Sequence, residues 1–258
     1  MTAEAFNLLD PIHFLNVIFF IGAAVGIPLA LKDSSRQTKN IFKYVLVAAI
    51  LYHEITNPFF KITERGFDWW DAMPLHMCAF STWCIAAYLV TKIRAFFVFA
   101  YFWGLTGGGM SILTPDTVLG FPSPEYLDTM YGHALILVGV FTAIFHMHER
   151  PYLKDYRNLM LVTTFVFLPL VYVFNLNFET NYWFVLEKPY GDNIMNFFPD
   201  APYHLIALIP AAYASAFESV SFGPSYLIVK TASLSSISIS FFSIPARATS
   251  IWKFSPSL

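Results

Sequence analysis

Long uncharged stretches of apolar residues alternate with short charged segments along the chain. Six of these stretches contain between 17 and 21 residues, close to the roughly 20 that a helix needs to cross about 30 Å of hydrocarbon. A seventh, residues 42–60, is equally apolar except for His53 and Glu54, so it crosses a membrane only if both side chains face a bundle interior. The pattern predicts an all-α polytopic transmembrane bundle of about seven helices, at residues 11–31, 42–60, 72–91, 95–115, 129–148, 158–178 and 201–217.

The composition agrees with a membrane protein. Of the 258 residues, 57% are hydrophobic and 12% are charged, whereas an ordinary soluble domain has roughly 25% charged residues. The aromatic fraction of 19% suits lipid-facing helices that carry rings at their ends. A formal net charge of -2 gives no basic surface for nucleic acid. We therefore expect membrane lipids as partners and no nucleic acid.

The distribution of Lys and Arg predicts the orientation of the bundle. Nine of these residues follow the first, third and fifth apolar stretches, and three follow the second, fourth and sixth. Cytoplasmic loops are enriched in Lys and Arg, so we expect the N-terminus outside and the first, third and fifth loops in the cytoplasm. Residues 1–10 contain no Lys or Arg, unlike the start of a signal peptide, and the first stretch is expected to be retained.

The chain changes character near its C-terminal end. Residues 219–258 contain twelve serines and no long apolar stretch. The sequence therefore predicts a transmembrane domain at residues 1–217 and a poorly ordered Ser-rich tail at residues 218–258.

Polar side chains within the apolar stretches gather near the ends that are predicted to be extracytoplasmic. Isolated polar groups in lipid are costly unless they share a hydrated or hydrogen-bonded site. The sequence therefore predicts one polar cavity that opens toward the outer leaflet. Its candidate residues are His53, Glu54, Asn57, His76, Cys78, Thr82, Thr114, Asp116, His133, Asn175, Asn177 and His204.

Cys78 and His133 are the pair in this layer with catalytic potential. They lie at similar depth on the third and fifth stretches, so the imidazole can take the thiol proton and the thiolate can attack an ester carbonyl. Thr82 shares a helix face with Cys78 and can orient either group, and Glu54 or Asp116 can hold the histidine tautomer. A structural role is the alternative, with Cys78 as an apolar packing residue and the histidines at the interface.

Glu54 has a second interpretation. A carboxylate deep in a membrane helix needs a partner or a proton, so we expect it to line the cavity and to bond to a histidine or a hydroxyl on another helix, with His76 or His204 favoured. In a non-enzymatic carrier or small-molecule binder, Glu54, His53 and Asp116 would bind a proton or cation instead.

No metal and no cofactor is expected. His76 and Cys78 are two residues apart, which turns them about 200° from each other on a helix. The last apolar stretch has no lysine for a retinal Schiff base. Gly104 and Gly108 indicate close helix packing, with a loosened backbone at the glycine run. Cys78 and Cys84 lie too far apart on one helix to form a disulfide.

Several ordered motifs resemble the YwaF-like family of bacterial integral membrane proteins over roughly residues 10–210. They are Pro74-Leu75-His76-Met77-Cys78, Tyr101-Phe102-Trp103-Gly104-Leu105, Leu113-Thr114-Pro115-Asp116, His133, Thr180-Asn181-Tyr182 and Lys188-Pro189. The Ser-rich tail does not resemble that family's apolar last span, which puts the seventh helix in doubt.

The resemblance implies a multi-pass location in a bacterial plasma membrane. A eukaryotic branch of the same superfamily is proposed to be a Cys/His phospholipid acyltransferase, and a further relative hydrolyses fatty-acid esters within the membrane. Cys78 and His133 match the Cys and His of that branch in order and approximate separation. The expected function is therefore lipid acyl transfer on a phospholipid or acyl ester, with ester hydrolysis and the carrier as alternatives. Glu54, His53, His76, Thr82, Thr114, Asp116, Asn181 and His204 are expected to bind or orient the substrate.

Overall fold

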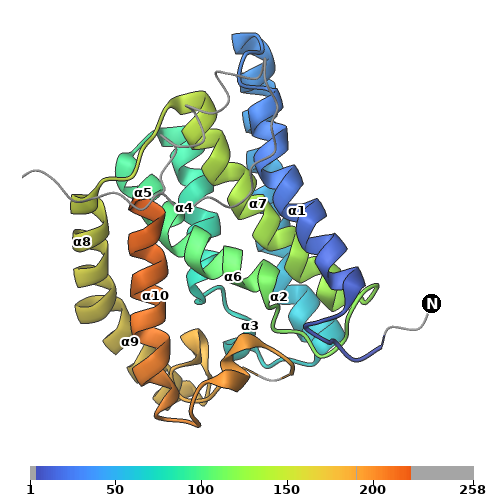
Figure 1. The fold of residues 1–258 in the computed structure, drawn as a ribbon, viewed down its shortest axis with the longest axis vertical. Coiled ribbons are helices and arrows are strands. Elements are labelled where there is room, and N and C mark those ends of the chain that lie inside the picture. The colour runs from blue at the N-terminus through green and yellow to red at the C-terminus, as the bar shows by residue number, and fades with distance from the viewer. Residues whose placement is uncertain (1–3, 190, 222–258) are drawn as a thin grey trace, which may run out of the picture. The chain divides into compact units, whose positions relative to one another are not determined.

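The computed structural model describes residues 4–189 and 191–221, all within the first of two compact units, residues 1–224. This part of the chain is helical and contains no strand, which confirms the predicted fold class (Figure 1). The predicted tail lies outside the described residues from position 222 onward. The helices are α1 (Pro11–Ala30), α2 (Arg36–Arg65), α3 (Trp69–Ala72), α4 (Met77–Thr91), α5 (Arg94–Trp103), α6 (Gly109–Leu113), α7 (Pro124–Met147), α8 (Leu153–Val162), α9 (Leu168–Phe178) and α10 (His204–Ser221).

Each predicted apolar stretch contains helix, with breaks and extensions. A π-helical turn, η1 (Gly104–Gly108), joins α5 to α6, and another, η2 (Thr163–Phe167), joins α8 to α9, so each pair crosses as one long helix. Four helical segments are long and apolar enough to span a membrane: Pro11–Ala30, Arg94–Leu113, Pro124–Met147 and Leu153–Phe178. The apolar helices at Met77–Thr91 and His204–Val220 are shorter.

The third stretch was expected to form one helix from residue 72, but α4 begins only at Met77. Met73 is extended, with φ -61° and ψ 146°, because a residue before proline is disfavoured in the helical region and Pro74 follows it. His76 is also extended and precedes the first turn of α4. This break places Cys78 at the second position of α4.

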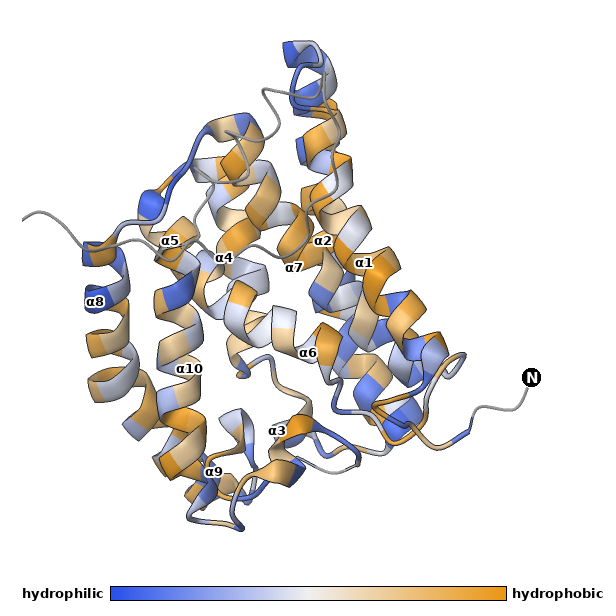
Figure 2. Cartoon of the chain, viewed as in Figure 1, coloured by the Kyte–Doolittle hydropathy of each residue, from blue (hydrophilic) through white to orange (hydrophobic). Residues whose placement is uncertain are grey.

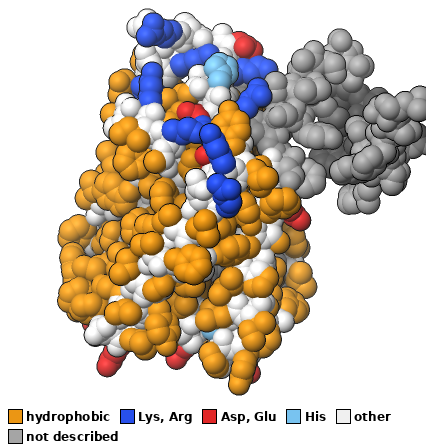
Figure 3. Space-filling view, turned by 90° about the vertical axis from the view of Figure 1, so that its left-hand side faces the viewer, with side chains coloured by type: hydrophobic (Ala, Val, Ile, Leu, Met, Phe, Trp, Pro, Cys, Tyr) orange, Lys and Arg blue, Asp and Glu red, His pale blue; other side chains and the backbone are white. Residues whose placement is uncertain are grey.

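The central helix of the bundle is α7, which packs against α1, α2 and α4 (Figure 1). In its most apolar window, 72% of the residues are buried inside the protein, against 22% for α1. Large apolar side chains of α1, such as Phe14, Leu15 and Ile18, are exposed, as are Phe165 and Leu170 on the η2–α9 segment. The ribbon is mostly apolar, and the surface shows a broad apolar region with Lys and Arg gathered at one end (Figures 2 and 3). Such a surface is suited to lipid, not water.

Glycines allow the central helices to approach closely. A Cβ on Gly104 would lie 2.7 Å from Ile136 of α7, and one on Gly139 would lie 2.6 Å from Ile85 of α4. The predicted close packing at Gly104 and loosened backbone at the glycine run are both present, the latter as the π turn η1.

Replacing Gly139 with Ala should destabilise the protein by about 1–3 kcal/mol, because overpacking a filled core forces neighbouring side chains to shift. The thermal midpoint of the purified protein in detergent measures this effect. Gly26→Ala is the control, since a Cβ there meets nothing within 4 Å and both glycines lie inside helices. Equal midpoints for the two variants would contradict close packing of α7 on α4.

Candidate functional site

A polar cavity of about 210 Å³ lies toward the C-terminal end of α2. Its walls come mainly from α2, α3 and the α3–α4 connection, α4, α6, α7 and Phe184 of the short 3-10 turn η3 (Tyr182–Phe184). Eight residues predicted for a cavity site line it: His53, Glu54, Asn57, His76, Cys78, Thr82, Asp116 and His133. The helix ends thus bring together groups that are up to 80 residues apart in the sequence.

Cys78 projects from the first turn of α4. Its Sγ lies 4.0 Å from the hydroxyl of Ser111 on α6, and a Cβ added to Gly107 would lie 3.2 Å from the same sulfur. The π turn at Gly107 therefore leaves room for the thiol. Cys84, six residues later, is also free but does not line the cavity.

His133 projects from α7, and its tautomer is fixed by its own helix. The Nδ1–H group donates to the carbonyl oxygen of Thr129, at 2.6 Å. A carbonyl can only accept, so in the neutral ring the lone pair lies on Nε2. The Cδ2 atom of the ring packs near Gly108, at 3.8 Å from an added Cβ. His133 thus presents a base to the cavity.

Glu54 is 7% exposed and lines the cavity from the middle of α2. The cavity also contains the hydroxyl of Thr82 on α4, which donates its one hydrogen to the carbonyl of Cys78, at 2.8 Å. Pro58, four residues after Glu54, has no N–H to bond to the Glu54 carbonyl. Glu54, Thr82 and Cys78 therefore line the same cavity from α2 and α4.

A three-residue network ties α2 to the start of α7. His53 Nε2 lies 3.1 Å from one oxygen of Asp128, and Asn57 donates to the other at 2.6 Å. His53 Nδ1 is buried and has no partner in the described part of the chain. An added Cβ on Gly132 would lie 2.3 Å from the His53 ring, so the ring rests on the backbone of α7.

Two cations extend the site beyond the predicted end of the second apolar stretch. Lys61 lines the cavity two helical turns beyond Glu54, and its ammonium group makes no hydrogen bond or ion pair within the described residues. Arg65 is paired with Glu125 of α7, at 2.6 Å. The positive charge of Lys61 lies among Glu54, Asp128 and Cys78.

Asp116 lies on the loop between α6 and α7, at the rim of the cavity. Its side chain is exposed, but the surrounding protein removes part of its hydration and raises the pKa of the carboxyl to about 6. The charges of Arg65 and Lys61 oppose this increase in pKa, and that of Glu125 adds to it.

His76 has an aromatic environment. Its ring contacts Tyr182 and Phe184, with centroids 4.8 Å and 5.5 Å away, and its Nδ1 lies 3.5 Å from the backbone N–H of Trp183. His76 therefore holds the loop after α9 against the cavity.

Five of the predicted residues do not line the cavity: Thr114, Asn175, Asn177, Asn181 and His204. Asn175 and Asn177 donate to the backbone carbonyls of Tyr182 and Val173 instead. His204, the first residue of α10, is fully buried and donates to the carbonyl of Phe184 at 2.7 Å. The Asn181 side chain bonds to the backbone of Leu186 and Glu187, and the Thr114 hydroxyl donates to Met110. These contacts shape the loops around the site.

Sequence reasoning missed Lys61 and Asp128, because the apolar stretches were cut at charged residues, and it missed Ser111 although this residue lies inside a predicted stretch. The continuation of α2 could have been read from the helical spacing of His53, Asn57 and Lys61 and from Gly66, which ends the helix in a left-handed conformation. Among residues 4–189 and 191–221, no group of three or more His, Cys, Asp or Glu side chains could hold a metal ion.

The helical bundle, its apolar surface and the polar cavity inside it define a multi-pass integral membrane protein. A family model matches residues 8–217, and the chain belongs to the TMEM164 family, a family of membrane proteins. No curated protein and no solved structure matches the chain. The resemblance to the YwaF-like family stays a prediction.

Replacing Asp116 with Asn should make the protein less sensitive to pH between about 4 and 6. The folded state holds the Asp116 proton up to about pH 6 and the unfolded state releases it near 3.8, so the wild type loses stability as pH rises through this interval. The thermal midpoint of Asp116→Asn, minus that of the wild type, should increase from pH 4 to pH 6 and then level off. The exposed Asp33 gives the control variant Asp33→Asn. A difference that stays constant with pH would contradict the raised pKa.

Proposed function

We propose that the cavity catalyses acyl transfer on membrane lipids, with Cys78 as nucleophile and His133 as general base. One observation carries this proposal: the two side chains reach the same cavity from α4 and α7, and the Thr129 carbonyl leaves His133 Nε2 free to accept a proton. An imidazole whose other nitrogen is held by an acceptor is the usual arrangement for activating a nucleophile.

The reaction divides into two half-reactions. His133 Nε2 takes the Cys78 proton, and the sulfur attacks the ester carbonyl of a lipid. The acyl C–O bond breaks, the released alcohol takes the proton from His133, and a Cys78 thioester remains. An acceptor hydroxyl then gives its proton to His133 and attacks the thioester, the C–S bond breaks, and the thiol regains its proton.

Neighbouring groups fit the charges that form in these steps. A thiolate at the second position of α4 faces the positive end of the helix dipole and the unpaired ammonium of Lys61. The Ser111 hydroxyl, 4.0 Å from the sulfur, is placed to donate to the carbonyl oxygen as negative charge develops there. Thr82 holds the first turn of α4 by donating to the Cys78 carbonyl.

The substrate class follows from the position of the cavity. It lies toward the end of α2 opposite Arg36, Lys39 and Lys43, and the distribution of Lys and Arg among the loops predicts this end to be extracytoplasmic. The substrate is then a phospholipid or another acyl ester of that leaflet, which enters with its chains still in the bilayer.

The test is acyl trapping on the purified protein in liposomes that contain phospholipid with a radiolabelled acyl chain. The wild type should acquire a label that neutral hydroxylamine removes, as expected for a thioester. Cys78→Ala should acquire none, and His133→Ala should be labelled about 10²–10⁴-fold more slowly, the usual effect of losing a general base.

Cys84→Ala is the matched control and should be labelled like the wild type, since Cys84 does not line the cavity. Labelling that survives Cys78→Ala would overturn the proposal. The fate of the label separates two enzymes: transfer to an added lysolipid indicates an acyltransferase, and release of free fatty acid indicates an ester hydrolase.

A proton- or cation-coupled carrier is the second candidate, because Glu54 is a buried carboxylate in a cavity with His53, Asp128 and Lys61. Glu54→Gln preserves the shape and removes the charge. Ion-coupled uptake into proteoliposomes that disappears in this variant, together with an absence of acyl labelling in the wild type, would favour the carrier.

A further inference from the structure

A second pocket lies at the opposite end of α2 from the candidate site. It has a volume of about 350 Å³, within the usual range for small-ligand sites, and it is lined by residues of α2 and α7 and of the last turns of α4. Lys39 and Lys61 are separated by about 33 Å along the helix axis, since a helix rises about 1.5 Å per residue. The second pocket is therefore a separate site.

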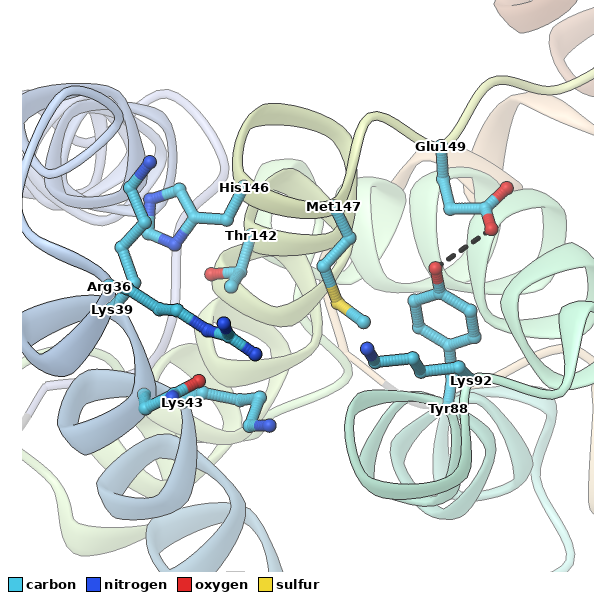
Figure 4. Close-up of a pocket in the computed structure, with 10 residues that line it drawn as sticks. Arg36, Lys39, Lys43, Tyr88, Lys92, Thr142, His146, Met147 and Glu149 are labelled. Atoms are coloured by element: carbon cyan, nitrogen blue, oxygen red, sulfur yellow. Dashed lines mark hydrogen bonds between the residues drawn. The ribbon is translucent and has the colours of Figure 1, made fainter.

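The lining of this pocket is strongly basic. Arg36, Lys39, Lys43 and Lys92 contribute four cations. Figure 4 shows the guanidinium of Arg36 and the ammonium of Lys92 pointing toward each other across the pocket, from α2 and from the end of α4. Within the described part of the chain, Arg36, Lys39 and Lys92 make no hydrogen bond or ion pair through their side chains, and Lys43 only stacks on Tyr44.

The single carboxylate in the lining is already engaged. Glu149 accepts a hydrogen bond from the Tyr88 hydroxyl at 2.8 Å (Figure 4) and is paired with Arg94, which lies outside the pocket. It does not neutralise the four cations. Like charges held around one concave space repel each other, so the pocket favours a ligand that brings negative charge.

Helix α2 adds to this positive potential. Its first turn begins at Arg36 and contains Lys39 but no acidic residue, although the positive end of a helix dipole favours acidic side chains. Free backbone N–H groups at a helix N-terminus are anion-binding groups. Ser35 caps this end by accepting from the N–H of Thr38, and the basic side chains there agree with the enrichment of Lys and Arg in cytoplasmic loops. They add their charge to the positive potential of the helix end.

The floor of the pocket offers acceptors. His146 donates through Nε2 to the carbonyl of Pro28 at 2.8 Å, and its Nδ1 is buried without a partner in the described residues. The Thr142 hydroxyl donates to Val138 at 2.7 Å, which leaves its lone pairs free. Both acceptors are buried, so the accessible polar groups of the pocket are its basic side chains.

We propose that this pocket binds a ligand with two or more phosphate groups at the cytoplasmic face. Basic pockets between membrane helices on that side are typical sites for phosphorylated lipid headgroups, and a soluble polyphosphate presents the same chemistry. Arg36, Lys39 and Lys92 contact the phosphate oxygens.

The experiment compares two phosphate sources on the full-length protein in nanodiscs. In one arm, neutral phosphatidylcholine nanodiscs receive inorganic tripolyphosphate; in the other, the nanodiscs contain phosphatidylinositol bisphosphate at a few per cent. The readout is the thermal midpoint against ligand concentration. The pocket variant is Arg36→Gln with Lys39→Gln, and Lys154→Gln with Arg157→Gln is the control, which removes the same charge from the start of α8.

The pocket variant should weaken binding at least tenfold, and the control should change it less than twofold. Lys92→Asn, on a different helix and with a side chain that tolerates the left-handed conformation of that residue, should give a similar loss. Binding in the lipid arm alone identifies a headgroup, and binding of tripolyphosphate identifies a soluble ligand. No binding in either arm, or equal losses in the pocket variant and the control, would overturn the proposal.

Discussion

The cost of placing polar groups among membrane helices is the constraint on which this structure depends. Glu54, His53 and Asn57 all project from α2, and none of them can be left in hydrocarbon without a partner. Asp128 of α7 pairs with His53 and Asn57, and Glu54 lies in a cavity that α4 also lines. The same contacts that make α2 tolerable in a membrane also create a polar space between three helices, and that space is the candidate site.

This pairing requires the backbones to approach closely, and glycine provides the room. The His53 ring lies over Gly132, where any side chain would occupy its place. One turn along α7, Ile136 fills the space that Gly104 leaves on the neighbouring segment. The polar network and the apolar packing therefore use adjacent turns of α7. A disturbance of the packing is expected to reach the hydrogen bonds of the site.

The fold class and the approximate positions of the seven helical regions could be predicted from the sequence, because uncharged stretches of membrane length report directly on burial in lipid. Helix ends were less accurate where charged residues were used as boundaries. Residue 129 was taken as the start of the fifth stretch, yet α7 begins at Pro124 after the capping residue Ser123. A serine followed by proline and glutamate is a readable helix start, and it would have included Asp128 in the helix.

The predicted depth of a residue along its helix is a good guide to whether the residue lines the candidate site. It is a poorer guide to the hydrogen-bond partner of that residue. Eight of the residues expected from depth and motifs line one cavity, because polar residues at equal depth on neighbouring helices come close to one another. Depth gives no information on rotation about a helix axis. His204 was expected in the cavity, but it donates a hydrogen bond to the carbonyl of Phe184 instead. The His53 ring packs on the backbone at Gly132. This contact depends on the relative rotation of α2 and α7, and no local sequence pattern encodes that rotation.

The π turn at Gly104–Gly108 gives the two parts of one long helix different environments. A π turn accommodates one more residue than an α turn, so the helix after it is rotated about its axis relative to a continuous α-helix. Before the turn, Phe97 and Tyr101 are buried in the apolar core. After it, Ser111 faces the cavity. The extra residue rotates the second part of the helix about its axis, so one helix presents a core-packing face before the π turn and a cavity-lining face after it. Deleting one residue from the glycine run would remove this rotation and bring the two faces into line.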